Sequence, residues 1–173
     1  MTDTIEYNLP TSWRGISLKK YIEISDIVIE ENEDSTFDGV DNTLKVLSIL
    51  TGIPTDELES MPLSEVQAMA NKISFISKEP LKKTFGQAHY QVLGIEEISY
   101  DAFLQYIQLS TNPIKNLPAI IQLFLVKKKP IEIIEEIDIV DAMVILEDLK
   151  KKLQKSLKRL VRLEKKKLKE FQK

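Results

Sequence analysis

Residues 138–171, DIVDAMVILEDLKKKLQKSLKRLVRLEKKKLKEF, decide the fold, because they contain no proline or glycine that would interrupt a helix. Asp138 can cap the first turn, and Asp141 stands three residues later, at the position where a capping box carries a glutamate or glutamine. The stretch predicts one terminal helix of about 50 Å at 1.5 Å per residue. A small domain spans only about 30 Å, so we expect the distal half of this helix to project or to pair with another surface.

Leucines on this helix recur every eleven residues, at 146, 157 and 168 and again at 149 and 160, where Phe171 continues the series. An eleven-residue repeat gives a nearly straight or slightly right-handed apolar stripe. A strict heptad would place Ser156 and Lys167 at the interface, so a left-handed coiled coil is disfavoured. The first half of the stripe can pack on its own domain; for the distal half we expect a partner. The residues predicted to bind it are Leu153, Leu157, Leu160, Leu168, Phe171, Lys158, Arg159 and Arg162.

Charge is divided unevenly along the chain, although the net charge is only −3. Residues 1–81 carry 15 acidic and 6 basic side chains, whereas residues 147–173 carry 12 basic and 4 acidic ones. A basic tail of this kind indicates an anionic partner, which could be nucleic acid, another protein or the acidic half of a second copy. The alternative is a helix whose lysines simply face water.

Upstream of residue 138, capping residues and prolines mark several shorter helices. The segment 116–128 is apolar on nearly every side and predicts a central buried helix. Residues 130–137 fit a helix or a short strand, and we favour the helix. Two short apolar runs, 81–85 and 90–93, flank Gly86 and predict a small β-hairpin. The predicted helices lie at about 18–24, 42–50, 56–60, 62–77, 100–110 and 116–128.

The predicted architecture is therefore mainly α: a compact helical domain at 1–137, with a small β-hairpin, followed by a long basic C-terminal helix at 138–173. The sequence ISLKKYIEI at 16–24 has a loose echo in ISYDAFLQY at 98–106. This echo suggests two related sub-bundles, 1–80 and 94–137, joined by the hairpin at 81–93.

The composition lacks several of the residue types on which enzyme mechanisms commonly depend. The chain has no cysteine, five glycines and a single histidine, His89, with no second histidine at metal-binding spacing. The acidic segment 29–42 lacks the oxygen ligands of an EF-hand. We therefore expect no enzymatic activity, no catalytic residues, no metal and no cofactor. The acidic start and the lack of a long apolar run also predict no signal peptide and no membrane contact.

Trp13 is the only tryptophan, and it lies in a segment predicted to be extended. An exposed tryptophan could anchor a partner protein, and Trp13 is therefore a candidate partner-binding residue. The alternative, which we favour, is that the ring covers the core.

Two segments carry a resemblance to a known family. Residues 47–66 read LSILTGIPTDELESMPLSEV: an apolar helix, a Thr-Gly stop, a short acidic turn and a new helix start. Residues 94–106, GIEEISYDAFLQY, lead towards the apolar segment NLPAIIQLFLV at 116–126. Over about residues 10–130 this pattern resembles the small helical tail-assembly chaperones encoded in tailed-phage structural gene clusters. The resemblance implies a non-enzymatic bacteriophage assembly protein in the host cytoplasm, which shields tail subunits through protein–protein contacts.

The basic tail at 147–173 has no counterpart in that family. A chaperone that is released after assembly does not obviously need it, whereas a protein retained in the particle could use it. The alternative is therefore a structural protein of the virion (ring, connector or internal component) whose copies associate through the C-terminal helix. The expected partners are phage tail or virion subunits or a second copy. Contact of the tail with DNA would be non-specific and limited to phosphates.

Overall fold

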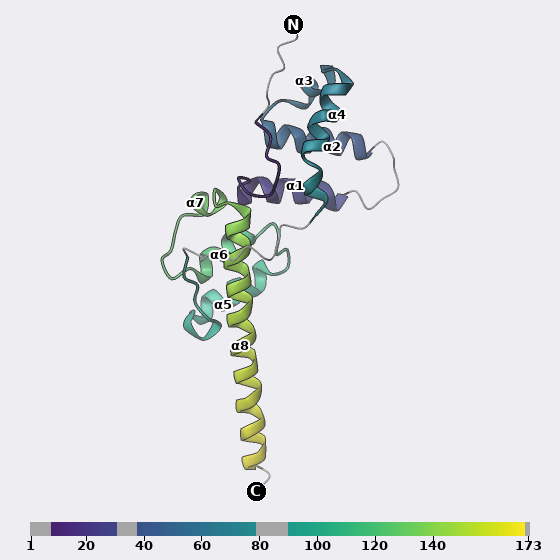
Figure 1. Ribbon diagram of the computed structural model, residues 1–173. Helices are drawn as coiled ribbons and strands as arrows, with labels where there is room; N and C mark the ends of the chain where they lie inside the picture. The colour runs from purple at the N-terminus through teal and green to yellow at the C-terminus, as the bar shows by residue number, and fades with distance from the viewer. Residues whose placement is uncertain (1–7, 31–37, 79–89, 172–173) are drawn as a thin grey trace. The chain divides into compact units, whose positions relative to one another are not determined.

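The computed structural model describes residues 8–30, 38–78 and 90–171, of which 28–30, 38–39, 160 and 163–171 are described by their backbone alone (Figure 1). These residues form eight α-helices and two 3₁₀-helices, with isolated β-bridges and no strand among them. The prediction of a mainly α fold is confirmed.

The chain divides into two units. The first comprises residues 1–81 and 136–140, and the second comprises 82–135 and 141–173. Most of the terminal helix belongs to the second unit. The first unit holds α1 (Leu18–Glu30), α2 (Asp38–Thr51), α3 (Thr55–Ser60), α4 (Leu63–Lys72) and η1 (Ser74–Ser77). The second holds η2 (Ile95–Glu97), α5 (Tyr100–Leu109), α6 (Leu117–Phe124), α7 (Ile131–Glu135) and all but the first two residues of α8 (Ile139–Phe171).

In the first unit, α2 contacts α1, α3 and α4, and its leucines supply much of the core. Leu47 and Leu58 are fully buried. Gly52 ends α2 with a φ of +77°, the left-handed conformation that glycine adopts at low cost after a helix. Helix α1 continues to Glu30, beyond the predicted end near 24, because residues 25–30 contain no helix breaker.

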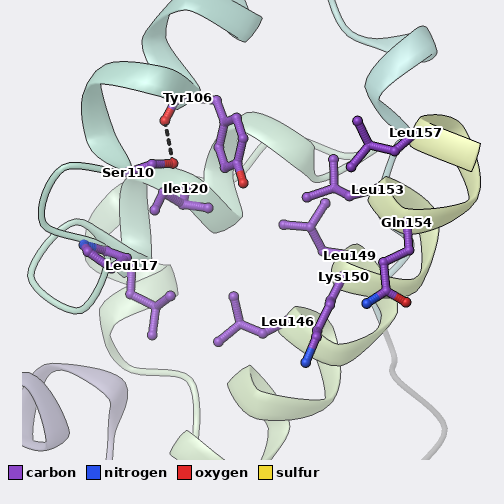
Figure 2. A pocket seen from close by; sticks show the side chains of 11 residues that line it. Tyr106, Ser110, Leu117, Ile120, Leu146, Leu149, Lys150, Leu153, Gln154 and Leu157 are labelled. Atoms are coloured by element: carbon purple, nitrogen blue, oxygen red, sulfur yellow. Dashed lines mark hydrogen bonds between the residues drawn. The ribbon is translucent and has the colours of Figure 1, made fainter. Parts of the chain in front are cut away.

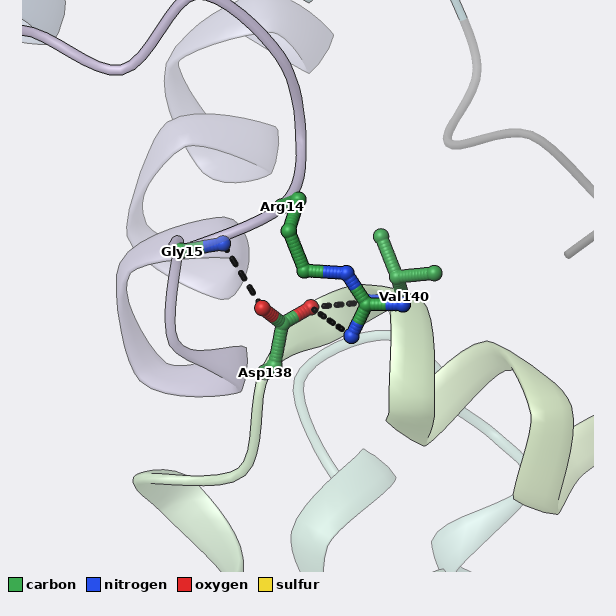
Figure 3. Close-up of polar contacts among 4 residues, drawn as sticks. All are labelled: Arg14, Gly15, Asp138 and Val140. Atoms are coloured by element: carbon green, nitrogen blue, oxygen red, sulfur yellow. Dashed lines mark hydrogen bonds and ion pairs between the residues drawn. The ribbon is translucent and has the colours of Figure 1, made fainter. Parts of the chain in front are cut away.

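A carboxylate joins the two chain segments of the first unit that are farthest apart in sequence. Asp138 accepts hydrogen bonds from the backbone N–H of Gly15 at 2.6 Å and of Val140 at 2.8 Å, and pairs with Arg14 at 3.6 Å (Figure 3). Beside it, Leu18 N–H donates to Ile137 and Ile139 N–H donates to Ile16, at 2.7 and 2.8 Å. Helices α1 and α8 therefore both begin at one antiparallel bridge.

In the second unit, α6 is the most deeply buried helix, as its sequence predicts. Ile121 and Phe124 are completely buried, whereas Leu123 is half-buried. Helix α6 ends at Phe124, before the predicted 128, because Leu125 turns extended and Val92 pairs with it. The ambiguous segment after Pro130 is helical, as favoured, over α7.

The predicted β-hairpin is not supported. Its first half, 81–85, lies outside the described residues, and its second half meets the segment after α6 instead of a neighbouring strand. Leu93 N–H donates to Phe124 at 2.7 Å, and Val126 N–H donates to Gln91 at 2.9 Å. Residues 91–93 thus form backbone hydrogen bonds with a segment about 33 residues further along the chain, at the end of a buried helix. The local pattern of apolar residues does not reveal this distant pairing.

Asp138→Ala should lower the free energy of unfolding of the first unit by about 1–2 kcal/mol, because two backbone N–H groups lose their acceptor. Urea unfolding followed by the fluorescence of Trp13, the single tryptophan, measures the change in this unit. The exposed Glu132 on α7 supplies the control, because Glu132→Ala should leave the midpoint of the urea transition unchanged. An unchanged midpoint for Asp138→Ala would contradict the bridging role.

Ile121→Asp should prevent folding of the second unit, because it leaves a carboxylate without a partner in the core at a cost of about 4 kcal/mol or more. Leu123→Asp, two residues away on the same helix, should cost much less because the half-buried side chain can reach water. Helical circular dichroism of both variants tests this difference, and equal losses would show that the burial pattern of α6 is wrong.

Candidate interaction site on helix α8

An apolar groove of about 270 Å³ separates α8 from α5 and α6 in the second unit (Figure 2). One wall carries leucines of α8, and the other carries side chains of α5, of α6 and of the turn between them. We call it the α5–α8 groove. It is lined by Tyr106, Ser110, Pro113, Leu117, Ile120, Leu146, Leu149, Lys150, Leu153, Gln154 and Leu157.

Local capping and ring contacts fix the wall opposite α8. The Ser99 hydroxyl accepts from Ala102 N–H at 3.1 Å and starts α5. The Asn116 side chain donates to Leu109 O at 2.9 Å, so the end of α5 is tied to the start of α6. The Tyr106 ring meets that of Phe124 edge-on, with centroids 5.3 Å apart. This wall is therefore formed before any ligand arrives.

Other contacts hold α8 to the rest of its unit from a different side of the helix. The Lys152 ammonium donates to Val92 O, and the Arg159 guanidinium pairs with Glu96 at 3.4 Å. Ser156 between them is buried. Helix α8 is thus attached as far as Arg159, while on its groove side Leu149 is buried, Leu146 and Leu153 are half-buried and Leu157 is exposed.

The apolar surface continues along α8 beyond the groove. Leu157 is 55% exposed and Val161 is 48% exposed, so two large apolar side chains of α8 face water beyond the groove. Lys158, Arg159 and Arg162 are exposed beside them. Apolar side chains and cations therefore share the surface of α8, as the sequence predicts.

The structure places the predicted partner-binding residues in three groups. Leu153 and Leu157 line the groove. Lys158, Arg159 and Arg162 are exposed cations on α8, although Arg159 already has a carboxylate partner. The predicted Leu160, Leu168 and Phe171 belong to α8, and their side chains lie outside the described part of the chain.

Trp13 lies in the core. Only 8% of it is exposed, its rings meet Tyr21 and Phe75 edge-on at 5.4 and 5.5 Å, and its indole N–H donates to Lys78 O at 2.7 Å. The placement agrees with the favoured alternative that the ring covers the core, and it leaves Trp13 unable to act as an exposed anchor.

Sequence reasoning missed the second wall of the groove and the exposed side of α5. Tyr100, Leu104 and Ile107 are all exposed. Their spacing of four and three residues is visible in the sequence and places them on one side of a helix. The wall formed by Tyr106, Leu117 and Ile120 gave no such signal, because apolar residues on a buried helix do not reveal which side is left open.

A second, more polar hollow of about 690 Å³ lies beside the Val92 bridge and includes Glu97, Asp148 and Lys152. Two of its charged groups serve the fold: Glu97 accepts from Gly94 N–H, and Lys152 donates to Val92 O. In the described residues no three histidine, aspartate or glutamate side chains gather as a metal would need.

Lys128 closes the end of α6, where its ammonium donates to Gln122 O at 2.9 Å and to Leu123 O at 2.6 Å. Partial burial of the ammonium lowers the pKa of Lys128 below its usual value. The contact is structural, because the carbonyls at a helix end have no partners within the helix.

No protein-family model, curated protein or solved structure matches this chain. The resemblance to tail-assembly chaperones therefore rests on the quoted residues alone. None of the helices in the described ranges combines the length and the apolar character that crossing a bilayer requires.

Trp13→Ala should lower the free energy of unfolding by about 3–5 kcal/mol, the usual cost of removing a large buried aromatic side chain. Trp13→Phe should cost far less, because it keeps most of the packing and loses the hydrogen bond to Lys78 O. Urea unfolding followed by circular dichroism compares the two variants. Unchanged stability of Trp13→Ala would instead favour a partner-binding role.

Proposed function

We propose that this protein is a non-enzymatic assembly factor of a tailed bacteriophage, which acts through protein–protein contacts made by α8. The observation that carries the proposal is the apolar surface of α8, where Leu153 and Leu157 line an open groove and Val161 continues it among exposed cations. A helix that served only its own core would bury these side chains.

The chemistry of the surface favours a protein over DNA as the main partner. Phosphate binding needs cations but has no use for exposed leucines, whereas a protein groove with an acidic rim would satisfy both kinds of group. Contact of Lys158 and Arg162 with DNA would be secondary, independent of sequence and weakened by salt.

The phage setting comes from the resemblance of 47–66 and 94–126 to tail-assembly chaperones. In that setting the groove would shelter an apolar segment of a tail subunit until the subunit polymerises, and the protein would act in the host cytoplasm.

A second candidate is a structural protein retained in the virion, favoured by the length and charge of α8. The helix spans 33 residues and carries 11 of the 24 lysines and arginines of the chain. A retained component would need a permanent contact surface of this size. Mass spectrometry of purified particles separates the two roles, since a retained component is stoichiometric and a released chaperone is absent.

A photo-crosslinking amino acid at Val161 in the full-length protein tests the proposal during infection. The exposed side chain should be covered in the assembled state, so we expect a crosslink to a phage structural subunit or to a second copy. A probe at the exposed Glu132 on α7 is the control and should react much less. Equal crosslinking at the two positions would contradict a contact role for α8.

A further inference from the structure

We infer that α8 pairs with α8 of a second copy, antiparallel and centred on Leu157. The inference deepens the proposed function by naming one partner for the same helix surface. It rests on that proposal only in requiring α8 to be a contact helix.

Nine positions on one side of α8, seven of them apolar and two charged, are spaced symmetrically about Leu157. Going backwards, the positions are 153, 150, 146 and 143, in steps of four, three, four and three residues; going forwards, they are 161, 164, 168 and 171, in the same steps. Steps of three and four residues keep all nine positions on one face of a helix. We call this face the α8 stripe.

The residues at these positions are symmetric in character as well. In the antiparallel pair Leu157 meets its own equivalent, Leu153 meets Val161, and Leu146 meets position 168, also a leucine. Met143 correspondingly meets position 171, a phenylalanine. Every apolar position therefore faces an apolar position.

Charge selects the antiparallel direction. The two polar positions in the stripe, Lys150 and Glu164, are equally far from Leu157, so each faces the other across an antiparallel pair. In a parallel pair, lysine would face lysine and glutamate would face glutamate. Like charges at these positions would oppose pairing, as charged residues do when they set the orientation of coiled coils.

Among the described side chains of the stripe, Lys150, Leu157 and Val161 are exposed, and Met143, Leu146 and Leu153 are half-buried. Leu146, Lys150, Leu153 and Leu157 all line the α5–α8 groove, and Leu157 and Val161 are about half exposed. The contacts that hold α8 to its own unit come from Lys152 and Arg159, with Ser156 buried between them, and these residues lie about 100° to 160° around the helix from Leu157. Pairing therefore requires none of them to break.

The groove also has room for what the second copy would bring. Its walls beside Leu146 include Leu117 and Ile120 of α6. In the antiparallel register, positions 168 and 171 of the second helix meet the stretch 143–146 at this end of the groove. A heptad alternates steps of three and four residues, whereas both steps next to Leu157 are of four residues. This spacing makes the helix pair straighter at its centre.

A charge-exchange experiment on the full-length protein tests the register. Sedimentation equilibrium should show a dimer for the wild-type protein. Lys150→Glu and Glu164→Lys should each weaken it at least about tenfold, because each creates two like-charge contacts per dimer. The double variant K150E/E164K should return to within about threefold of wild type.

Lys151→Glu is the matched control, because it changes the net charge equally on a neighbouring exposed residue outside the stripe. It should leave the dimer nearly unchanged. The helical circular dichroism signal of every variant shows whether a variant that does not pair has also failed to fold. A monomeric wild-type protein, equal effects of K150E and K151E, or no recovery in the double variant would each overturn the inference.

Cysteine crosslinking tests the direction of pairing, since the chain has no cysteine of its own. A mixture of Lys150→Cys and Glu164→Cys chains should form a disulfide between the two variants. Crosslinking of either variant with itself would indicate a parallel pair and overturn the proposal. If the Val161 probe captures another phage subunit while the protein sediments as a monomer, the proposed function stands and the pairing fails.

Discussion

The first unit depends on one carboxylate between two distant chain segments. Asp138 accepts from Gly15 N–H and Val140 N–H, so it satisfies the backbone at the turn before α1 and at the first turn of α8. The backbone bonds of Leu18 to Ile137 and of Ile139 to Ile16 repeat the connection without side chains. Residues 136–140 are part of the first unit, and the start of α8 is held by hydrogen bonds to residues that lie about 120 positions earlier in the chain. A helix whose beginning is held in this way can carry a contact surface far along its length.

Helix α8 divides its surface between folding and exposure. Ile145 and Leu149 are buried, and Lys152 and Arg159 tie the helix to residues 92–96. Leu157 and Val161 have no such cover. An apolar surface left in water costs free energy that a small domain can seldom spare, so a sequence that keeps one among so many lysines indicates a use for it. The contact with another protein that we propose would use both the leucines and the cations.

The charged groups of the polar hollow and those of α8 have different neighbours. Two charged side chains of the hollow bond to backbone groups, Glu97 to Gly94 and Lys152 to Val92. The cations of α8 stand beside apolar residues instead of the aromatic rings that stack on bases in single strands.

The sequence by itself determined the helices whose signals are local: Ser99 caps α5, Gly52 ends α2, and the unbroken run after Asp138 forms α8. It also placed Leu153 and Leu157 on one side of that helix, because their spacing is a property of the helix alone. The tertiary structure decided what depends on distant residues. Trp13 became a core residue through Phe75 and Lys78, the segment 91–93 found its partner at the end of α6, and Tyr106, Leu117 and Ile120 became the second wall of a groove. Periodicity shows which residues share a face, but only packing decides which part of that face stays open.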